Sequence, residues 1–145
     1  NNNLIKRDKL TIAGEPIDLD RIVQPLYVVT AEDDHIAPWK QCYRIRKYIN
    51  VQATVRFVRS SSGHILGIVN PPVNPPKRSY WIGEPERNEH WEHWFDRAEH
   101  KPGSWWEDWI VWLGGRCGDL VDAYPAASRA YPARAEAPGT YVLEK

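Results

Sequence analysis

Two strand-like segments, each followed directly by a polar loop, constrain the fold of this chain more than any other feature. Leu26–Thr30 and Val55–Val58 are apolar and rich in β-branched residues, as expected of strands buried in a parallel sheet. The first leads into an acidic loop at 32–39, and the second leads into a serine- and glycine-containing loop at 61–65. Apolar residues at helical spacing lie between the segments, after Pro38. The pattern predicts a strand–helix–strand unit and therefore an α/β fold.

The two loops carry a carboxylate and a histidine in positions typical of a catalytic triad. Asp34 follows the first strand and His64 follows the second. In α/β-hydrolases the triad members occur along the chain in the order nucleophile, acid, histidine. Asp34 and His64 have that order, although Asp33 has nearly the same spacing and competes for the role of the acid. An aspartate in a turn is more often a turn or cap residue, so only the combination of both loops indicates catalysis.

No convincing nucleophile precedes this pair. Cys42 falls inside the expected helix, where cysteine commonly serves as a small buried apolar side chain. Cys117 lies in the segment Gly115–Gly118, which follows no strand, comes after the histidine and lacks a Gly-x-Cys-x-Gly frame. The segment Glu89–His93 is not a zinc motif, because its histidines are three residues apart rather than four. We therefore expect no metal and no other cofactor.

Composition indicates which partners and which cellular compartment the chain is suited to. The 19 basic and 19 acidic residues give zero net charge, which does not favour a nucleic-acid partner. No apolar run approaches the roughly 18 residues of a transmembrane span. Two cysteines do not form a disulfide framework, which favours a reduced, cytoplasmic protein. The chain contains no methionine and opens on Asn1 without a signal sequence, so we expect an internal or C-terminal fragment of a longer protein.

The second half of the chain is rich in proline and tryptophan. Four prolines within Pro71–Pro76 predict an extended segment. Short helices are expected at 91–98 and 104–113, the second with a capping box formed by Ser104 and Glu107. The helical spacing of the tryptophans favours packing in a core or an interface over an exposed stacking surface, although exposure toward a hydrophobic partner stays open.

Several motifs together resemble those of a known enzyme family. Asp34–Trp39 (DHIAPW), Ser62–Ile65 (SGHI), Val69–Pro72 (VNPP) and Gly103–Trp109 (GSWWEDW) resemble the C-terminal part of polyhydroxyalkanoate synthases, and most closely the class I poly(3-hydroxyalkanoate) polymerases. Ala137–Val142 resembles the ending of that family. The resemblance extends over nearly the whole chain.

The resemblance implies a Cys-Asp-His triad in an α/β-hydrolase-type domain. Asp34 and His64 match the catalytic acid and histidine of the family, whereas its cysteine lies upstream and matches no position here. The implied reaction transfers (R)-3-hydroxyacyl groups from coenzyme A thioesters to a growing polyester, in a cytoplasmic homodimer associated with polyester granules. This fragment alone should be inactive. His35 is a candidate substrate-binding residue because it adjoins the acid, and a simple loop role is equally open.

These observations predict a domain organisation and leave two other functions open. We expect the C-terminal portion of an α/β-hydrolase catalytic domain at 1–76, a tryptophan-rich helical appendage packed on it at 77–122, and an extended tail at 123–145. One alternative is an esterase or polymer depolymerase with a serine nucleophile in the upstream Gly-x-Ser-x-Gly frame. The other is a noncatalytic interaction module that uses the tryptophan surface. Wide separation of Asp34 from His64 would favour that module.

Overall fold

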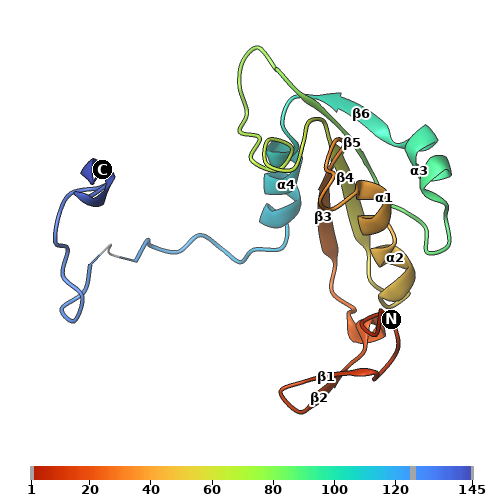
Figure 1. The fold of residues 1–145 in the computed structure, drawn as a ribbon. Helices are drawn as coiled ribbons and strands as arrows, with labels where there is room; N and C mark the ends of the chain where they lie inside the picture. Colours follow the sequence, from red (N-terminus) through yellow and green to blue (C-terminus); the bar gives the residue numbers. More distant parts are fainter. Residues whose placement is uncertain (1, 125–126, 145) are drawn as a thin grey trace. The chain divides into compact units, whose positions relative to one another are not determined.

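The computed structural model of the chain describes residues 2–124 and 127–144. Contacts divide the chain into two compact units, Asn1–Gly115 and Arg116–Lys145. Within the described residues, every strand and every α-helix lies in the first unit (Figure 1). The fold that positions the functional residues is therefore that of the first unit.

A four-stranded sheet forms the centre of the first unit. Its strands are β3 (Leu26–Ala31), β4 (Val55–Ser60), β5 (Ser79–Gly83) and β6 (Glu99–Pro102), in that spatial order. Strands β3 and β4 are parallel, with Leu26 opposite Val55 and Ala31 opposite Ser60, whereas β5 and β6 are added antiparallel. The predicted parallel pair is thus confirmed, and both of its strands end at the same edge of the sheet.

The connection between β3 and β4 consists of two short helices rather than the single helix that the spacing predicts. Helix α1 (Trp39–Cys42) follows Pro38 at its N-cap, and α2 (Ile45–Tyr48) ends before Ile49, whose backbone is extended. Between them Arg44 donates its backbone N–H to the carbonyl of Gln41, the three-residue spacing of a tight 3₁₀ turn. The connection nevertheless returns the chain in the direction required for parallel pairing.

A small hairpin precedes the sheet. Strands β1 (Leu10–Ile12) and β2 (Glu15–Ile17) pair antiparallel around the two-residue loop Ala13–Gly14. Both loop residues have positive φ, 51° and 86°, as in the tight turns that match the twist of paired strands. A 3₁₀ helix (Leu19–Arg21), capped by the Asp18 side chain, then leads to β3.

The region 77–122 contains strands as well as the helices that the sequence predicts. Strand β5 was missed because its alternation of buried Tyr80 and Ile82 with half-buried neighbours covers only five residues. Strand β6 is short, polar and ends on Pro102, which a sheet tolerates at an edge. The helices themselves are close to their expected bounds, α3 at Trp91–Arg97 and α4 at Trp105–Gly114.

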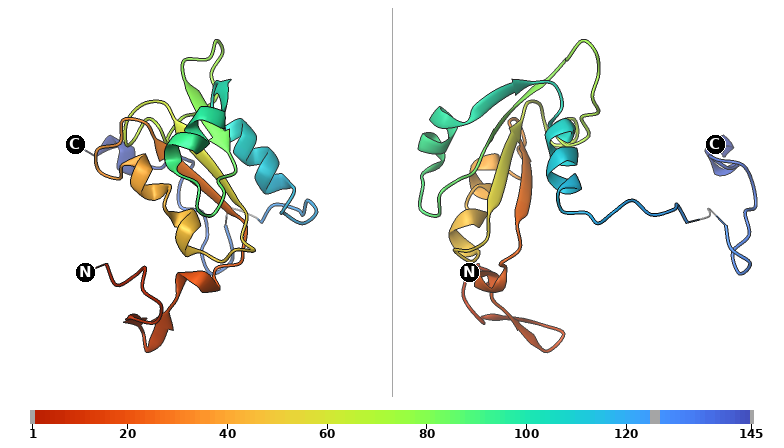
Figure 2. Two further views of the ribbon diagram at one scale, coloured as in Figure 1. Left: turned by 90° about the vertical axis from the view of Figure 1, so that its right-hand side faces the viewer. Right: turned by 180° about the vertical axis from the view of Figure 1, so that it is seen from behind.

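Helices cover both faces of the sheet, α1 to α3 on one side and α4 on the other (Figures 1 and 2). Successive residues of β4 point to opposite faces, so Phe57 packs with Trp39, Tyr43 and Trp94, whereas Val58 packs with Trp105. The exposed fractions of Trp94, Trp39 and Trp105 are 0%, 7% and 8%. These three tryptophans are core residues, as the packing interpretation predicts.

Helix α4 is fixed to the sheet by a partly buried polar network as well as by aromatic packing. The Asp108 carboxylate accepts hydrogen bonds from Arg56 Nε at 2.7 Å and from the Tyr27 hydroxyl at 3.0 Å. Burial raises the pKa of Asp108, but the bonds from Arg56 and Tyr27 outweigh it, and the net shift is downward. The carboxylate therefore stays ionised and joins α4 to both parallel strands.

The second unit, described at 116–124 and 127–144, consists largely of irregular backbone with one 3₁₀ turn at Tyr141–Leu143. Several of its large apolar side chains are solvent-exposed, among them Leu120, Val121 and Tyr124. In the described parts of the chain, no helix combines the length and the apolar character needed to cross a bilayer.

Candidate active site

Asp34 and His64 meet at the edge of the sheet where β3 and β4 end. The Nδ1 of His64 lies 2.8 Å from Oδ2 of Asp34, within hydrogen-bonding distance. The two loops are also joined through their backbones, because Glu32 N–H donates to the Ser60 carbonyl and Asp33 N–H donates to the Ser62 carbonyl. The parallel register thus continues one step past the strands and brings the two loops together.

The local backbone holds the Asp34 carboxylate in a fixed orientation. Its Oδ1 accepts hydrogen bonds from the N–H groups of Ile36 and Ala37, both at 2.9 Å, which leaves Oδ2 for His64. The side chain of Asp34 is only 7% exposed. The bond from Ala37, followed by the bond from His64, lowers the pKa of Asp34 below its ordinary value. Asp34 is therefore a carboxylate at neutral pH.

A carboxylate at this position determines which nitrogen of His64 carries the proton. Because Asp34 can only accept, the Nδ1 of His64 must donate, and Nε2 is then the acceptor in the neutral ring. The His64 side chain is 47% exposed, so the ring is open to solvent. The arrangement is that of a base with an orienting acid. The same geometry distinguishes the two candidate acids, because Asp33 is exposed and Asp34 faces His64.

The loop that carries His64 is attached to the N-terminal end of α4, a connection that sequence reasoning missed. The indole N–H of Trp105 donates to the Gly67 carbonyl at 3.0 Å, and that of Trp106 donates to the Ile68 carbonyl at 3.1 Å. Ser104 donates its hydroxyl to the Asn70 carbonyl while its oxygen caps α4 by accepting from the backbone of Trp106. The motif Gly103–Trp109, whose tryptophans suggested only packing, thus holds the histidine loop.

Gly67 allows the histidine loop to lie directly against the end of β3. A Cβ at this position would overlap the Cβ of Ala31 and would lie 2.9 Å from the Gly63 carbonyl oxygen. The Gly67 N–H also donates to that carbonyl at 2.8 Å, closing the turn that contains His64. Any larger residue would push the turn away from Asp34.

A buried arginine near the end of β4 contacts the loop that carries Asp34. Arg59 of β4 forms an ion pair with Glu32, two residues before the acid. Its guanidinium carbon lies 4.5 Å to 5.1 Å from the ring centroids of Trp39, Trp81 and Phe95. Cation–π contacts and the ion pair together stabilise the cation in this aromatic surrounding. Arg59 thereby links the end of one parallel strand to the loop that follows the other.

Neither cysteine has the surroundings of an activated nucleophile. Cys42 is half-buried, and its thiol donates to the Ala37 carbonyl at 3.7 Å. Burial, and then the negative charge of Asp34, raise the pKa of this thiol. Cys117 is exposed and lies in the second unit. Among the described residues, no hydrogen bond joins either sulfur to His64.

The remaining predicted positions lie at the surface. His35 is exposed beside the acid. The apolar side chains around the pair are also exposed, with Ile36 at 65%, Ile65 at 67% and Leu66 at 52%. No group of three or more histidine, cysteine or acidic side chains in the described part of the chain is arranged to hold a metal ion.

Comparison with known proteins identifies relatives along nearly the whole chain. No family model matches. The chain is 39% identical to poly(3-hydroxyalkanoate) polymerase 1 of Ectopseudomonas oleovorans, over 99% of this chain and 25% of the relative. It is 39% identical to the poly(3-hydroxyalkanoate) polymerase subunit PhaC of Cupriavidus necator and 36% identical to that of Rhizobium etli, covering 24% and 22% of them.

These matches confirm the family resemblance carried by the motifs around Asp34, His64 and Trp105. The chain spans about a quarter of the length of the curated relatives. It is a relative of the poly(3-hydroxyalkanoate) polymerases.

Proposed function

We propose that this chain supplies the acid and the histidine of a polyester polymerase, and that the nucleophilic cysteine lies in a part of the enzyme outside this chain. The observation that carries the proposal is the 2.8 Å contact between Asp34 and His64 at the ends of two parallel strands. The similarity to poly(3-hydroxyalkanoate) polymerases supports the identity of the reaction. The substrate is a (R)-3-hydroxyacyl thioester of coenzyme A.

The chemistry requires the neutral form of the imidazole, in which Nε2 accepts a proton. His64 Nε2 accepts the proton of the cysteine thiol, and the thiolate attacks the thioester carbonyl. The bond from that carbon to the sulfur of coenzyme A breaks, and the imidazolium returns the proton to the departing thiolate. The hydroxyl of a second acyl unit then gives its proton to Nε2 and attacks the acyl-enzyme, so the polyester is extended and the cysteine regains its proton. Asp34 stabilises each transient imidazolium.

The exposed apolar side chains beside the pair suit an acyl substrate. Ile36 follows the acid, and Ile65 and Leu66 follow the histidine, so all three are within a few residues of the reacting groups. His35 lies in the same loop and is a candidate contact to the substrate. Contact with the acyl chain or with other parts of the enzyme would remove these side chains from water.

The fold and assembly of the complete enzyme belong to the same proposal. The unit of β3, the α1–α2 connection and β4 is the final parallel part of an α/β-hydrolase-type sheet. We assign 1–76 to the catalytic domain, 77–122 to a tryptophan-rich addition to it, and 123–145 to a tail. The complete enzyme acts as a cytoplasmic homodimer at the surface of polyester granules.

Site-directed variants of the complete polymerase that carries this segment test the proposal. His64→Ala should lower coenzyme A release and polymer formation by about 10² to 10⁴, the usual loss when a general base is removed. Cys117→Ala is the control and should remain active, because Cys117 is exposed and follows a helix rather than a strand. A folded His64→Ala enzyme, checked by circular dichroism, that polymerises at a normal rate would refute the assignment. If the unaltered enzyme releases free hydroxy acid in place of polymer, the alternative function of an esterase or polymer depolymerase is favoured.

A further inference from the structure

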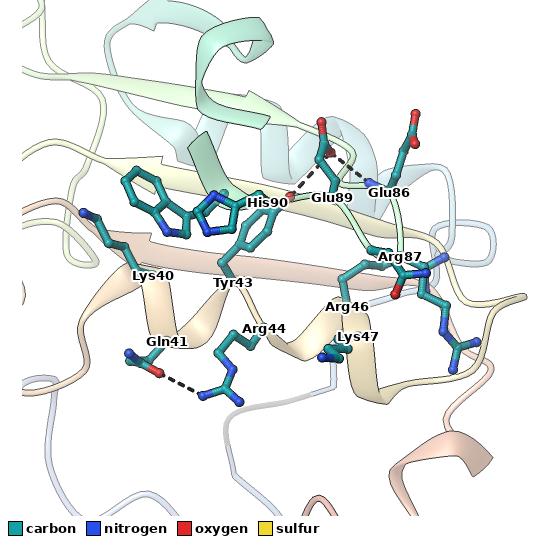
Figure 3. A pocket seen from close by; sticks show the side chains of 12 residues that line it. Lys40, Gln41, Tyr43, Arg44, Arg46, Lys47, Glu86, Arg87, Glu89 and His90 are labelled. Atoms are coloured by element: carbon teal, nitrogen blue, oxygen red, sulfur yellow. Dashed lines mark hydrogen bonds between the residues drawn. The ribbon is translucent and has the colours of Figure 1, made fainter. Parts of the chain in front are cut away.

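A cavity lies between the α1–α2 connection and the segment that precedes α3 (Figure 3). Its volume is about 560 Å³, within the range of small-molecule sites. Neither Asp34 nor His64 lines it. The cavity is therefore separate from the residues proposed for acyl transfer.

The lining of the cavity is strongly basic in a chain whose net charge is zero. The basic residues come from the connection and from the opposite segment: Lys40, Arg44, Arg46, Lys47 and Arg87. The two acidic lining residues are Glu86 and Glu89, and Glu89 is engaged by Arg97 at 2.6 Å. The hydrogen bond from Arg97 lowers the pKa of Glu89. Arg87 is paired with Asp20 at 3.5 Å, so the positive charge excess around the cavity comes from Lys40, Arg44, Arg46 and Lys47 against Glu86.

In the described part of the chain, the two central arginines donate hydrogen bonds to neutral acceptors and form no ion pair. Arg44 donates to the Gln41 side-chain oxygen at 3.2 Å and to the Tyr48 hydroxyl at 2.6 Å, which are neutral acceptors. Arg46 donates to the backbone carbonyls of Asn50 and Val51, both at 3.3 Å. These bonds orient the guanidinium groups without neutralising them, and positioned guanidinium groups suit phosphate oxygens.

Aromatic side chains complete the cavity. The Lys40 ammonium lies 3.8 Å from the ring centroid of Trp91, a cation–π contact that holds the lysine at the rim. Tyr43 and His90 also line the cavity, and the His90 and Trp91 ring centroids are 5.4 Å apart. Both sides of the cavity contribute cationic groups and aromatic rings, and this combination matches a ligand that has both phosphates and a planar ring.

We propose that this cavity binds a nucleotide through its phosphate groups. Phosphates would contact Arg44, Arg46 and Lys47, with the base toward the rings of Trp91 and His90. Free nucleotides and the nucleotide portion of coenzyme A share this chemistry. If the bound nucleotide belongs to coenzyme A, the cavity holds the coenzyme A part of the acyl thioester substrate. Only this assignment to coenzyme A rests on the function proposed above.

Calorimetric titration of the protein with ADP, coenzyme A and pyrophosphate tests the proposal. In the charge-reversed variant Arg44→Glu/Lys47→Glu, nucleotide affinity should fall at least about tenfold, the effect of losing one or more charge-assisted bonds. Lys77→Glu reverses an exposed charge that does not line the cavity and should leave affinity unchanged. If charge reversal prevents folding, as seen by circular dichroism, Arg44→Gln/Lys47→Gln replaces it with the same expected direction.

The outcomes separate the ligands and the two proposals. Tighter binding of coenzyme A than of ADP supports a carrier site, and equal binding supports a free-nucleotide site. Three results would overturn the nucleotide site. They are normal nucleotide affinity in the Arg44/Lys47 variants, an equal loss of affinity in Lys77→Glu, and tighter binding of pyrophosphate than of either nucleotide. His64→Ala should leave nucleotide binding intact even though polymerisation fails, so failure of one proposal is distinguishable from failure of the other.

Discussion

At the scale of single residues, the carboxylate of Asp34 is the most constrained group near the candidate site. Two backbone N–H groups and the His64 ring occupy both of its oxygens. An asparagine would preserve the size of the side chain, but its amide nitrogen could not accept the proton of His64 Nδ1. The residue thus combines a structural function in its own turn with the orientation of the histidine.

We predict that Asp34→Asn lowers stability in a pH-dependent way. The folded-state pKa of Asp34 lies below its ordinary value of 3.8, so its contribution to stability is complete above that value. The contribution is lost as the pH falls through the lowered, folded-state pKa. Urea unfolding between pH 7 and pH 2.5 should therefore show a difference from the unaltered chain that shrinks below about pH 4.

Asp33→Asn is the matched control, because Asp33 is exposed next to Asp34. It should produce little change in the unfolding free energy at any pH. A difference between Asp34→Asn and the unaltered chain that stays constant down to pH 2.5 would contradict the role of the charge.

Sequence reasoning predicted that His64 lies close to an acidic loop but could not say which aspartate it contacts. The positions after two parallel strands follow from the hydrophobic pattern, and so the proximity of His64 to an acid could be predicted. The selection of Asp34 over Asp33 depends on one turn, in which Oδ1 binds the N–H groups of Ile36 and Ala37. Such a turn is set by backbone dihedrals that spacing along the chain does not reveal.

At the scale of secondary-structure elements, α4 connects the parallel strands to the loop that carries His64. Asp108 fixes the helix to β3 and β4, and Trp105 and Trp106 bind the loop that follows β4. The tryptophan-rich motif could be predicted to be a helix from its periodicity and from Ser104 at its start. Its attachment to the histidine loop could not, because both indole donors bind carbonyls 38 residues away.

We predict that Asp108→Ala destabilises the first unit by about 2 to 4 kcal/mol at neutral pH, since removal of one partner leaves the Arg56 charge and the Tyr27 hydroxyl without their acceptor. The Asp108 side chain is 11% exposed, so water replaces the lost bonds poorly. Urea unfolding followed by tryptophan fluorescence gives the free energy. Asp96→Ala removes an exposed carboxylate of α3 and should change stability by less than about 0.5 kcal/mol.

The close approach of Gly67 to β3 gives a second prediction at this scale. Gly67→Ala should cost about 1 to 3 kcal/mol, because its Cβ would collide with Ala31 and force the turn outward. In the complete polymerase the same change should lower the polymerisation rate, since His64 lies in the displaced turn. Gly114→Ala, whose Cβ would meet nothing within 4 Å, should leave both stability and rate unchanged or slightly improved. Equal behaviour of the two variants would exclude a special role for Gly67.

At the scale of the whole molecule, the hydrophobic clusters explain why the first unit forms a fold although the chain is only about a quarter as long as its relatives. One cluster around Trp94 and another around Trp105 cover opposite faces of the same sheet. The parallel half of that sheet was predictable from two long apolar runs. The antiparallel half was not, because β6 is polar and is defined by its pairing with β5 rather than by its own pattern.

The last prediction concerns the activity of this chain alone. Incubation with 3-hydroxybutyryl-coenzyme A should release no thiol above background, because the acid and base have no activated nucleophile to serve. Cys42 keeps its proton to a higher pH than a free cysteine, since burial and Asp34 both oppose the thiolate. The complete polymerase, assayed in parallel, is the positive control. Thiol release by this chain that disappears in Cys42→Ser or Cys117→Ser would instead identify a nucleophile within it and would refute the proposal that the cysteine lies elsewhere in the enzyme.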